Sequence, residues 1–202
     1  MDRSRYRQTF VHYEKSPEVK GIQYLDPIVK AIENREVLRI YYLPFYEDKP
    51  YFIDVHPYLL KEYESRWYLI GFNAFKGKLR TYALDRIRDL QVDTGVSYTP
   101  PGFNTETYFR YAIGIIAPEG EPPLIKLAVQ KTQAQYLITR PWHDSQNIEE
   151  ENDEEVIFSF RVHPTYEFRS LVLSLGKDGT ILEPPSLRAE IKQELNQMLN
   201  HY

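Results

Sequence analysis

The side chains best suited to binding chemistry lie close together, between Ser65 and Ile87. Guanidinium groups bind phosphate through two parallel hydrogen bonds, and they also stack on aromatic rings. Proteins that bind single-stranded nucleic acids combine such cations with flat rings that stack on bases. The stretch therefore predicts a site for an anionic, base-bearing ligand, with five candidate ligand-binding residues: Arg66, Tyr68, Arg80, Tyr82 and Arg86.

A β-hairpin is the element expected to position these residues. Residues 66–72 are aromatic and β-branched, 73–78 contain turn residues that include Gly77, and 79–84 form the return strand. Alternation along a strand places Arg66 with Tyr68 on one face, and Arg80 with Tyr82 on one face. We expect the three guanidinium groups to converge beside phenol rings on a single wall, outside the hydrophobic interior.

A solvated surface is the alternative interpretation of the same arginines. Exposed ion pairs contribute only about 0–1 kcal/mol each, and the nearby acids Glu62, Glu64 and Asp85 are available as partners. Trp67 and Leu69 are predicted to fill the core, because burying a Trp removes about 200 Å² from water.

Three further residues extend the candidate site: Tyr42, His56 and Tyr58. A histidine beside a proline is more often a hydrogen-bonded structural residue than a ligand contact. Tyr42 and Tyr58 accompany His56 on neighbouring strands and could extend the aromatic surface.

Neither a metal site nor a catalytic centre is predicted. The chain has no cysteine, and His143 and His163 are not accompanied by carboxylates at ligand spacing. Nucleophile elbows, phosphate-binding glycine loops and zinc-protease motifs are missing as well. We therefore expect a protein that is not an enzyme and has no cofactor.

Charge is distributed unevenly along the 202 residues, whose net charge is −4. Residues 1–95 hold 16 Lys/Arg and 14 Asp/Glu, whereas residues 96–202 hold 9 and 15. An anion-binding surface is accordingly expected as a local patch in the first half. No apolar run approaches the ~20 residues of a membrane span, and no signal-type stretch follows Met1, so a cytoplasmic protein is expected.

The first half predicts a short helix followed by a small β-barrel. Asp26 is expected to cap the helix, with Pro27 at its first helical position and Asn34 at its end. Five close-spaced antiparallel strands are then expected at 38–46, 51–62, 66–74, 79–84 and 86–93. Gly95, Pro100, Pro101 and Gly102 mark a linker.

The second half predicts a β-α-β-β-α-β order, which is typical of a ferredoxin-like domain. The expected strands are 124–130, 142–150, 156–163 and 180–183. One helix is expected at 132–139, with Thr132 and Gln135 as a capping box. Another is expected to be capped by Thr165 and to end at Gly176. Residues 108–116 fit either a helix or a strand. A terminal helix from Ser186 carries Leu187, Ile191, Leu195 and Leu199 at i, i+4 spacing, a stripe that must dock on its own domain or across a dimer.

Six segments in order resemble the WYL domain of bacterial transcriptional regulators and its C-terminal extension, WCX. The WYL-like segments are Ile40-Tyr41-Tyr42, Val55-His56-Pro57-Tyr58-Leu59, Trp67-Tyr68-Leu69, and Arg80-x-Tyr82 with Leu84-Asp85-Arg86-Ile87. The WCX-like segments are Arg140-Pro141-Trp142-His143, and Leu173-Ser174-Leu175-Gly176 with Leu182-Glu183-Pro184-Pro185-Ser186-Leu187-Arg188. The resemblance implies an α+β chain with a connector at 1–22, an Sm/SH3-like barrel at 23–95, a linker at 96–104 and a ferredoxin-like extension at 105–202.

The resemblance also implies a function. The first hypothesis is an effector-sensing and dimerising module of a transcriptional regulator, which binds a nucleotide-like or single-stranded nucleic-acid ligand on the barrel. Duplex DNA is expected to be bound only through a helix-turn-helix domain, which residues 1–202 do not contain. The second hypothesis is a protein–protein interaction module that regulates a partner enzyme through its tyrosine-rich face.

Overall fold

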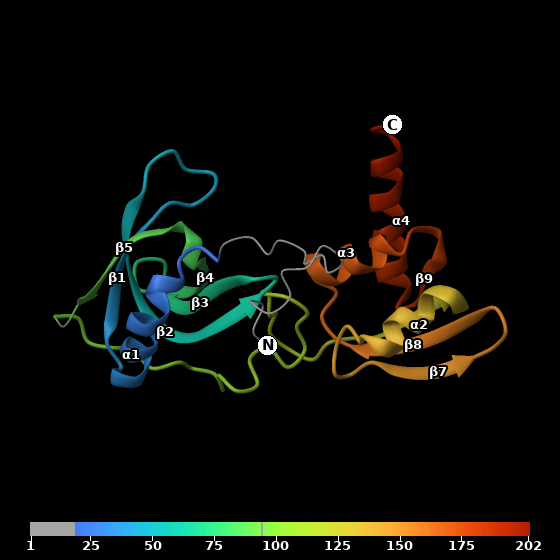
Figure 1. The fold of residues 1–202 in the computed structure, drawn as a ribbon, viewed down its shortest axis with the longest axis horizontal. Helices are drawn as coiled ribbons and strands as arrows, with labels where there is room; N and C mark the ends of the chain where they lie inside the picture. The colour runs from blue at the N-terminus through green and yellow to red at the C-terminus, as the bar shows by residue number, and fades with distance from the viewer. Residues whose placement is uncertain (1–18, 94) are drawn as a thin grey trace, which may run out of the picture. The chain divides into compact units, whose positions relative to one another are not determined.

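A computed structural model describes residues 19–93 and 95–202, which divide into two compact units between Gly102 and Phe103 (Figure 1). The architecture is α+β, and every pair of adjacent strands in each of the two sheets is antiparallel. None of the helices in the described part is long and apolar enough to cross a membrane.

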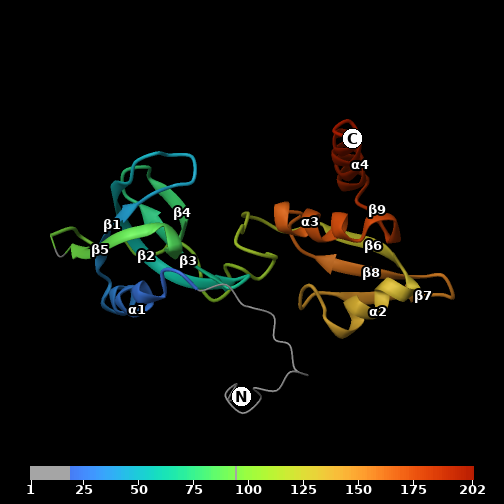
Figure 2. The ribbon, with the colours of Figure 1, turned by 45° about the horizontal axis from the view of Figure 1, so that its top comes forward.

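The first unit is a five-stranded sheet with one α-helix packed against it (Figure 1, Figure 2). The strand order is β4-β3-β2-β1-β5, so β4 and β5 are edges and the described residues form no closed barrel. The elements are the 3-10 turn η2 (Ile22–Tyr24), α1 (Leu25–Asn34), β1 (Val37–Tyr42), β2 (Tyr51–Tyr63), β3 (Arg66–Asn73), β4 (Lys78–Ala83), the 3-10 turn η3 (Leu84–Arg86) and β5 (Ile87–Asp93).

Helix α1 begins earlier than the sequence predicts. Its N-cap is Tyr24, because η2 leads directly into the helix, and Asp26 therefore lies in the first turn instead of capping it. A carboxylate in the first turn still favours the helix through the macrodipole. Ile28 and Ala31 are fully buried against the sheet, and they fix the face that α1 presents to it.

Gly21 allows the chain to enter η2 in close contact with η3. Its φ is +83°, and a Cβ atom at this position would lie 2.4 Å from the carbonyl carbon of Leu84. Both the left-handed backbone and the lack of space require glycine here.

The second unit has the predicted β-α-β-β-α-β order, with the sheet order β7-β8-β6-β9. Its core contains Phe158, Phe160 and Phe168, with Trp142 stacked on Phe160. The elements are β6 (Leu124–Gln130), α2 (Lys131–Thr139), β7 (Asn147–Glu151), β8 (Glu155–Arg161), α3 (Tyr166–Ser174), the 3-10 turn η4 (Gly176–Asp178), β9 (Gly179–Glu183) and α4 (Pro185–Leu199).

Several local expectations in this unit are wrong. Gln130 is the N-cap of α2 and no side chain caps the helix, so Thr132 and Gln135 form no capping box. Thr165 is at the N-cap of α3, but its hydroxyl makes no hydrogen bond there. Strand β7 begins only at Asn147, because residues 142–146 form a turn closed by the side chain of Gln146. Residues 108–116 form turns, neither helix nor strand.

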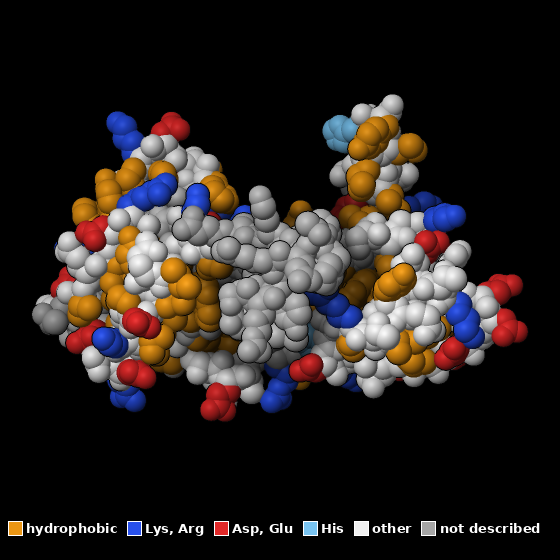
Figure 3. Space-filling model, viewed as in Figure 1, with side chains coloured by type: hydrophobic (Ala, Val, Ile, Leu, Met, Phe, Trp, Pro, Cys, Tyr) orange, Lys and Arg blue, Asp and Glu red, His pale blue; other side chains and the backbone are white. Residues whose placement is uncertain are grey.

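Helix α4 docks on its own unit along only half of its length. Leu187 and Ile191 are buried in the core, whereas Leu195 and Met198 are half exposed and Leu199 is 71% exposed. Figures 1 and 2 show α4 running outward from its sheet, and Figure 3 shows hydrophobic side chains along the projecting end.

Candidate ligand-binding site

The register of the β3–β4 hairpin separates the predicted site residues into two groups. Tyr82 pairs with Leu69 and Arg80 with Gly71, and paired residues in an antiparallel ladder project to the same face. Leu69 is fully buried in the core cluster, so Arg80 and Tyr82 belong to the core side of the sheet. Alternation then places Arg66 and Tyr68 on the opposite face. The expected convergence of three guanidinium groups on one wall is therefore wrong for Arg66, which is exposed.

Tyr42 and Tyr82 form a buried aromatic pair on the core side. Their rings meet edge to face at 5.3 Å. The Tyr42 hydroxyl accepts a hydrogen bond from the Ala83 backbone N–H at 3.2 Å, and the Tyr82 hydroxyl accepts one from Asn73 Nδ2 at 2.9 Å. Burial raises the pKa of Tyr82 to about 12 and also raises the pKa of Tyr42, so both phenols stay neutral. These two buried phenols pack beneath the exposed residues of the candidate site and do not form its surface.

Arg80 is exposed beside this pair. Its positive charge lies close enough to Tyr82 and Tyr51 to oppose the increase in their pKa values that burial causes. Within residues 19–93 and 95–202, Arg80 forms no ion pair, so its guanidinium group is available to an anion.

Arg86 completes a group of residues that we call the Arg/Tyr cluster, because its charge also acts on Tyr42. Its members lie at one end of the sheet, where β1 leads into β2 and β4 leads into η3. The cluster consists of Tyr42, Tyr51, Arg80, Tyr82 and Arg86.

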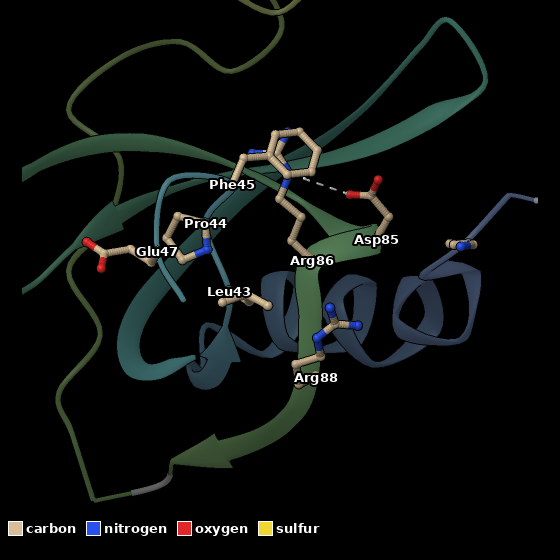
Figure 4. A pocket seen from close by; sticks show the side chains of 8 residues that line it. Leu43, Pro44, Phe45, Glu47, Asp85, Arg86 and Arg88 are labelled. Atoms are coloured by element: carbon tan, nitrogen blue, oxygen red, sulfur yellow. Dashed lines mark ion pairs between the residues drawn. The ribbon is translucent and has the colours of Figure 1, made fainter. Parts of the chain in front are cut away.

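Arg86 also lines a pocket of about 320 Å³, which we call the Arg86 pocket (Figure 4). The Phe45 ring lies over the guanidinium group, 3.4 Å from its central carbon, in the geometry of a cation–π contact. Three cations and two acids share the lining, which leaves a modest positive balance. The lining residues are Lys20, Leu43, Pro44, Phe45, Glu47, Asp85, Arg86 and Arg88.

Sequence reasoning missed Lys20, Phe45 and Arg88 as parts of this site. Residues 38–46 read as one continuous strand, but β1 ends at Tyr42 and the following residues form a loop up to Tyr51. Pro44 and Pro50 bracket that loop, and they were the available signal. Phe45 is 73% exposed, which is unusual for a phenylalanine and is consistent with a stacking surface.

His56 and Tyr58 hold a segment of the linker against β2. The His56 Nδ1 atom accepts a hydrogen bond from the Thr99 backbone N–H at 2.8 Å, and the Tyr58 hydroxyl donates to the Thr99 carbonyl at 2.9 Å. The Tyr98 hydroxyl donates to the Pro57 carbonyl at 2.8 Å. We call residues 98–100 the strap.

Burial governs the titration of both residues at the strap. It lowers the pKa of His56, against the opposing charge of Asp54, and raises the pKa of Tyr58 to about 12. His56 pairs with Phe72 on β3, which places it on the same face as Tyr68 and away from Arg80 and Tyr82. His56 therefore makes a structural hydrogen bond to the strap, which is the first of the two roles considered for it, the other being a ligand contact.

Within the described residues, no group of three or more His, Asp or Glu side chains could hold a metal ion. The Nδ1 atom of His143 lies 2.9 Å from the Ser145 hydroxyl, and the Nε2 atom of His163 lies 3.2 Å from the Gly120 carbonyl. Both histidines make hydrogen bonds within the second unit.

Two solved structures resemble the chain. One is proteasome accessory factor B/C (PafBC) of Arthrobacter aurescens, with 20% identity, a TM-score of 0.43, and coverage of 92% of this chain and 28% of that one. The other is described as a CRISPR Cas-related protein, with 16% identity, a TM-score of 0.52, and coverage of 90% of this chain and 52% of that one. This chain thus spans about half or less of each neighbour's length, and at such identities the second likeness concerns the fold alone. No curated protein matches the chain.

Two family models match separate parts of the sequence. The WYL domain matches residues 23–92, which include the Arg/Tyr cluster, and the WCX domain matches residues 121–199. The chain belongs to the WYL-domain family and carries the WCX domain of that family.

Proposed function

We propose that the chain is the effector-sensing module of a WYL-family transcriptional regulator, and that a nucleotide-like or single-stranded nucleic-acid ligand binds at the Arg/Tyr cluster and the Arg86 pocket. The observation that carries this proposal is the stacking of Phe45 on Arg86 beside two further pocket cations, Lys20 and Arg88. The proposal assigns no catalytic step to the chain.

The ligand class follows from what the exposed groups can hold. Guanidinium groups bind phosphate oxygens, and an exposed ring offers its face to a base, at about 1–3 kcal/mol per stacked base. Arg80 and Arg88 are exposed and can approach phosphates directly, whereas Arg86 is half-buried beneath the Phe45 ring. Such contacts make the affinity fall as salt concentration rises, because counterions are released from the ligand.

The finer fold classes form part of the same proposal. One helix and five antiparallel strands in the first unit support an open variant of an Sm/SH3-like barrel. The β-α-β-β-α-β order, with sheet order β7-β8-β6-β9, supports a ferredoxin-like class for the second unit.

A homodimer completes the proposed module. The exposed half of α4 supports this step, because Leu195, Met198 and Leu199 extend the buried stripe of Leu187 and Ile191 beyond the unit's own core. A ligand bound at the first unit would then shift the populations of two dimer arrangements. Duplex DNA would be bound only by a helix-turn-helix domain outside these residues.

The decisive experiment replaces the two arginines of the cluster together. Arg80→Ala with Arg86→Ala is expected to abolish binding of a fluorescent oligothymidylate, because both arginines of the Arg/Tyr cluster are lost. Arg66→Ala is the matched control, since Arg66 is an exposed arginine of the same hairpin on the opposite face, and it should lower affinity by less than about threefold.

Fluorescence anisotropy measures the affinity, and circular dichroism verifies that each variant is folded. Wild-type affinity in a folded double variant would contradict the proposal, as would an Arg66→Ala loss equal to that of the double variant.

A protein–protein interaction module is the second candidate, favoured by the exposed aromatic residues Tyr46 and Phe75, which are 82% and 96% exposed. Aromatic side chains are enriched among the residues that dominate protein interfaces. Titration with oligonucleotides and mononucleotides separates the two candidates. Saturable binding supports the first, and a silent titration together with a co-purifying protein supports the second.

A further inference from the structure

Two buried polar atoms beside the Arg86 pocket make no hydrogen bond in the described part of the chain. They are Asp85 Oδ1 and Arg86 Nε, which lie 3.9 Å apart. That distance permits an ion pair but is too long for a hydrogen bond. A buried polar atom without a hydrogen bond is costly, so the pair requires a physical explanation.

A single group can satisfy both atoms at once only if it both accepts and donates a hydrogen bond. An ionised carboxylate accepts hydrogen bonds and cannot donate, whereas a guanidinium N–H donates and cannot accept. A phosphate oxygen would suit Arg86 but would be repelled by Asp85, and an amine would suit Asp85 but not Arg86. A hydroxyl group accepts from one partner and donates to the other, so it can bridge them.

The Phe45 ring controls access to this pair. It covers the face of the Arg86 guanidinium group, and Figure 4 shows the ring beside the ion pair of Arg86 and Asp85. Phe45 belongs to the loop between β1 and β2, outside both strands, and most of its surface is exposed. A base that stacks with Phe45 can therefore move the ring aside without breaking a strand.

A ribonucleotide carries all the groups that these residues address. Its base can stack with Phe45, its phosphate can pair with Arg88 and Lys20, and its ribose has a hydroxyl next to the phosphodiester linkage. The 2′-hydroxyl is both a donor and an acceptor, and it is the group by which proteins distinguish RNA from DNA. A deoxyribonucleotide within a strand lacks it.

We propose that Asp85 and Arg86 select a ligand with a hydroxyl group beside its phosphate, so that the site prefers a single-stranded ribonucleotide ligand to its deoxyribonucleotide counterpart. This inference rests on the proposed function and names the ligand class of the same site. Asp85 is the residue that determines the preference, because its carboxylate would accept the hydrogen bond that a 2′-hydroxyl donates.

The test compares oligouridylate with oligodeoxyuridylate of equal length, which differ only in the 2′-hydroxyl. The wild-type chain is expected to bind the ribose form about tenfold more tightly, the factor that corresponds to one hydrogen bond to a charged group. Asp85→Ala should bring the ratio of the two affinities close to one, and Asp85→Asn, which keeps the shape and a weaker acceptor, should give an intermediate ratio.

Glu47→Ala is the matched control, because Glu47 is the other acid of the same pocket. Its removal changes the charge equally, so both affinities should move together and their ratio should persist. Equal wild-type affinities for the two oligonucleotides would overturn the inference and leave the proposed function in place. An undiminished preference in the folded Asp85→Ala variant would also overturn it. Absence of binding by both oligonucleotides would overturn the single-stranded nucleic-acid part of the proposed function, and the inference with it.

Discussion

Buried polar side chains next to the Arg/Tyr cluster show how individual residues hold the candidate site in place. Asn73 lies in the core side of the hairpin, where its Nδ2 atom donates to the Tyr82 hydroxyl and its Oδ1 atom accepts from the Lys76 backbone N–H at 2.7 Å. Tyr82 in turn packs edge to face on Tyr42. The side-chain amide of Asn73 thus links the hairpin turn to the buried pair of Tyr42 and Tyr82 in the Arg/Tyr cluster.

Replacing this amide should destabilise the first unit. Asn73→Ala is expected to lower the free energy of unfolding by about 1–3 kcal/mol, because it leaves the buried Tyr82 hydroxyl and the Lys76 amide without their partners. Urea denaturation of the single variants and of Asn73→Ala with Tyr82→Phe measures the effect. The double variant should lose less than the sum of the single losses, since Tyr82→Phe removes the orphaned hydroxyl. Strictly additive losses would contradict the coupling.

Some of the candidate site residues could be predicted from the sequence, and others could not. Residue types identified Arg80, Tyr82, Arg86 and Tyr42, and the structure places them together. Arg66 could not be separated from them, because the face of a residue depends on how β3 pairs with β4, and that register is a long-range property. The proximity of Asp85 and Phe45 could not be predicted from the sequence. Phe45 lies in the loop after β1 and Asp85 lies in the 3-10 turn η3, and these two segments are distant in sequence.

At the scale of elements, the strap connects the linker to β2 through His56, Tyr58 and Tyr98. His56 can accept the Thr99 hydrogen bond only while Nδ1 carries no proton, so the neutral ring is the form that holds the strap. Burial favours that form, and the facing groups are the Asp54 carboxylate, which opposes the shift, and the neutral phenols of Tyr58 and Tyr98.

The pH dependence of stability follows from this shift. The folded-state pKa of His56 lies below the unfolded value of about 6.5, so the unfolded chain binds more protons between the two values. The contribution of His56 should therefore make the free energy of unfolding rise as pH rises through that window and level off above it. Urea denaturation at several pH values, compared between the wild-type chain and His56→Gln, isolates this contribution from the other histidines. Parallel pH profiles of the two proteins would contradict it.

Most strands and helices could be predicted from the sequence, and the helix starts lie within two residues of expectation, but the helix caps could not be predicted. Strands 124–130 and 51–62 appear within one residue of expectation, because alternation and β-branched residues dominate there. The caps of α1 and α2 depend instead on how the preceding chain enters each helix, through η2 in one case and directly from β6 in the other. A barrel was expected, but in the described part of the chain β4 and β5 do not pair and the sheet stays open. Whether the two edge strands of a sheet pair is not specified by the local sequence.

At the scale of the whole molecule, the projecting half of α4 carries an exposed apolar surface. Leu195, Met198 and Leu199 follow one face of the helix and continue the stripe buried in the unit's core. An exposed apolar stripe of this kind is typical of an association surface.

Charged substitutions on that stripe should disrupt the proposed homodimer without unfolding either unit. Leu195→Lys with Leu199→Lys is expected to give a monomer, because burying two ammonium groups in an apolar contact is unfavourable. Gln193→Lys with Gln197→Lys is the control, since it adds the same charge to the opposite, exposed face of the same helix segment. Light scattering coupled to size-exclusion chromatography gives the mass of each variant. A monomeric wild-type chain, or equal masses for all three proteins, would contradict the assignment.

The close contact of Gly21 with Leu84 has a mechanical consequence for the proposed regulatory role. Gly21 has no room for even a methyl group against the turn that carries Asp85 and Arg86, and its neighbour Lys20 lines the same pocket. A ligand that displaces this turn must therefore push on the polypeptide where it enters the WYL domain. A displacement of the turn would therefore be transmitted to the chain on the amino-terminal side of Gly21. The coupling is steric and acts through the backbone at position 21.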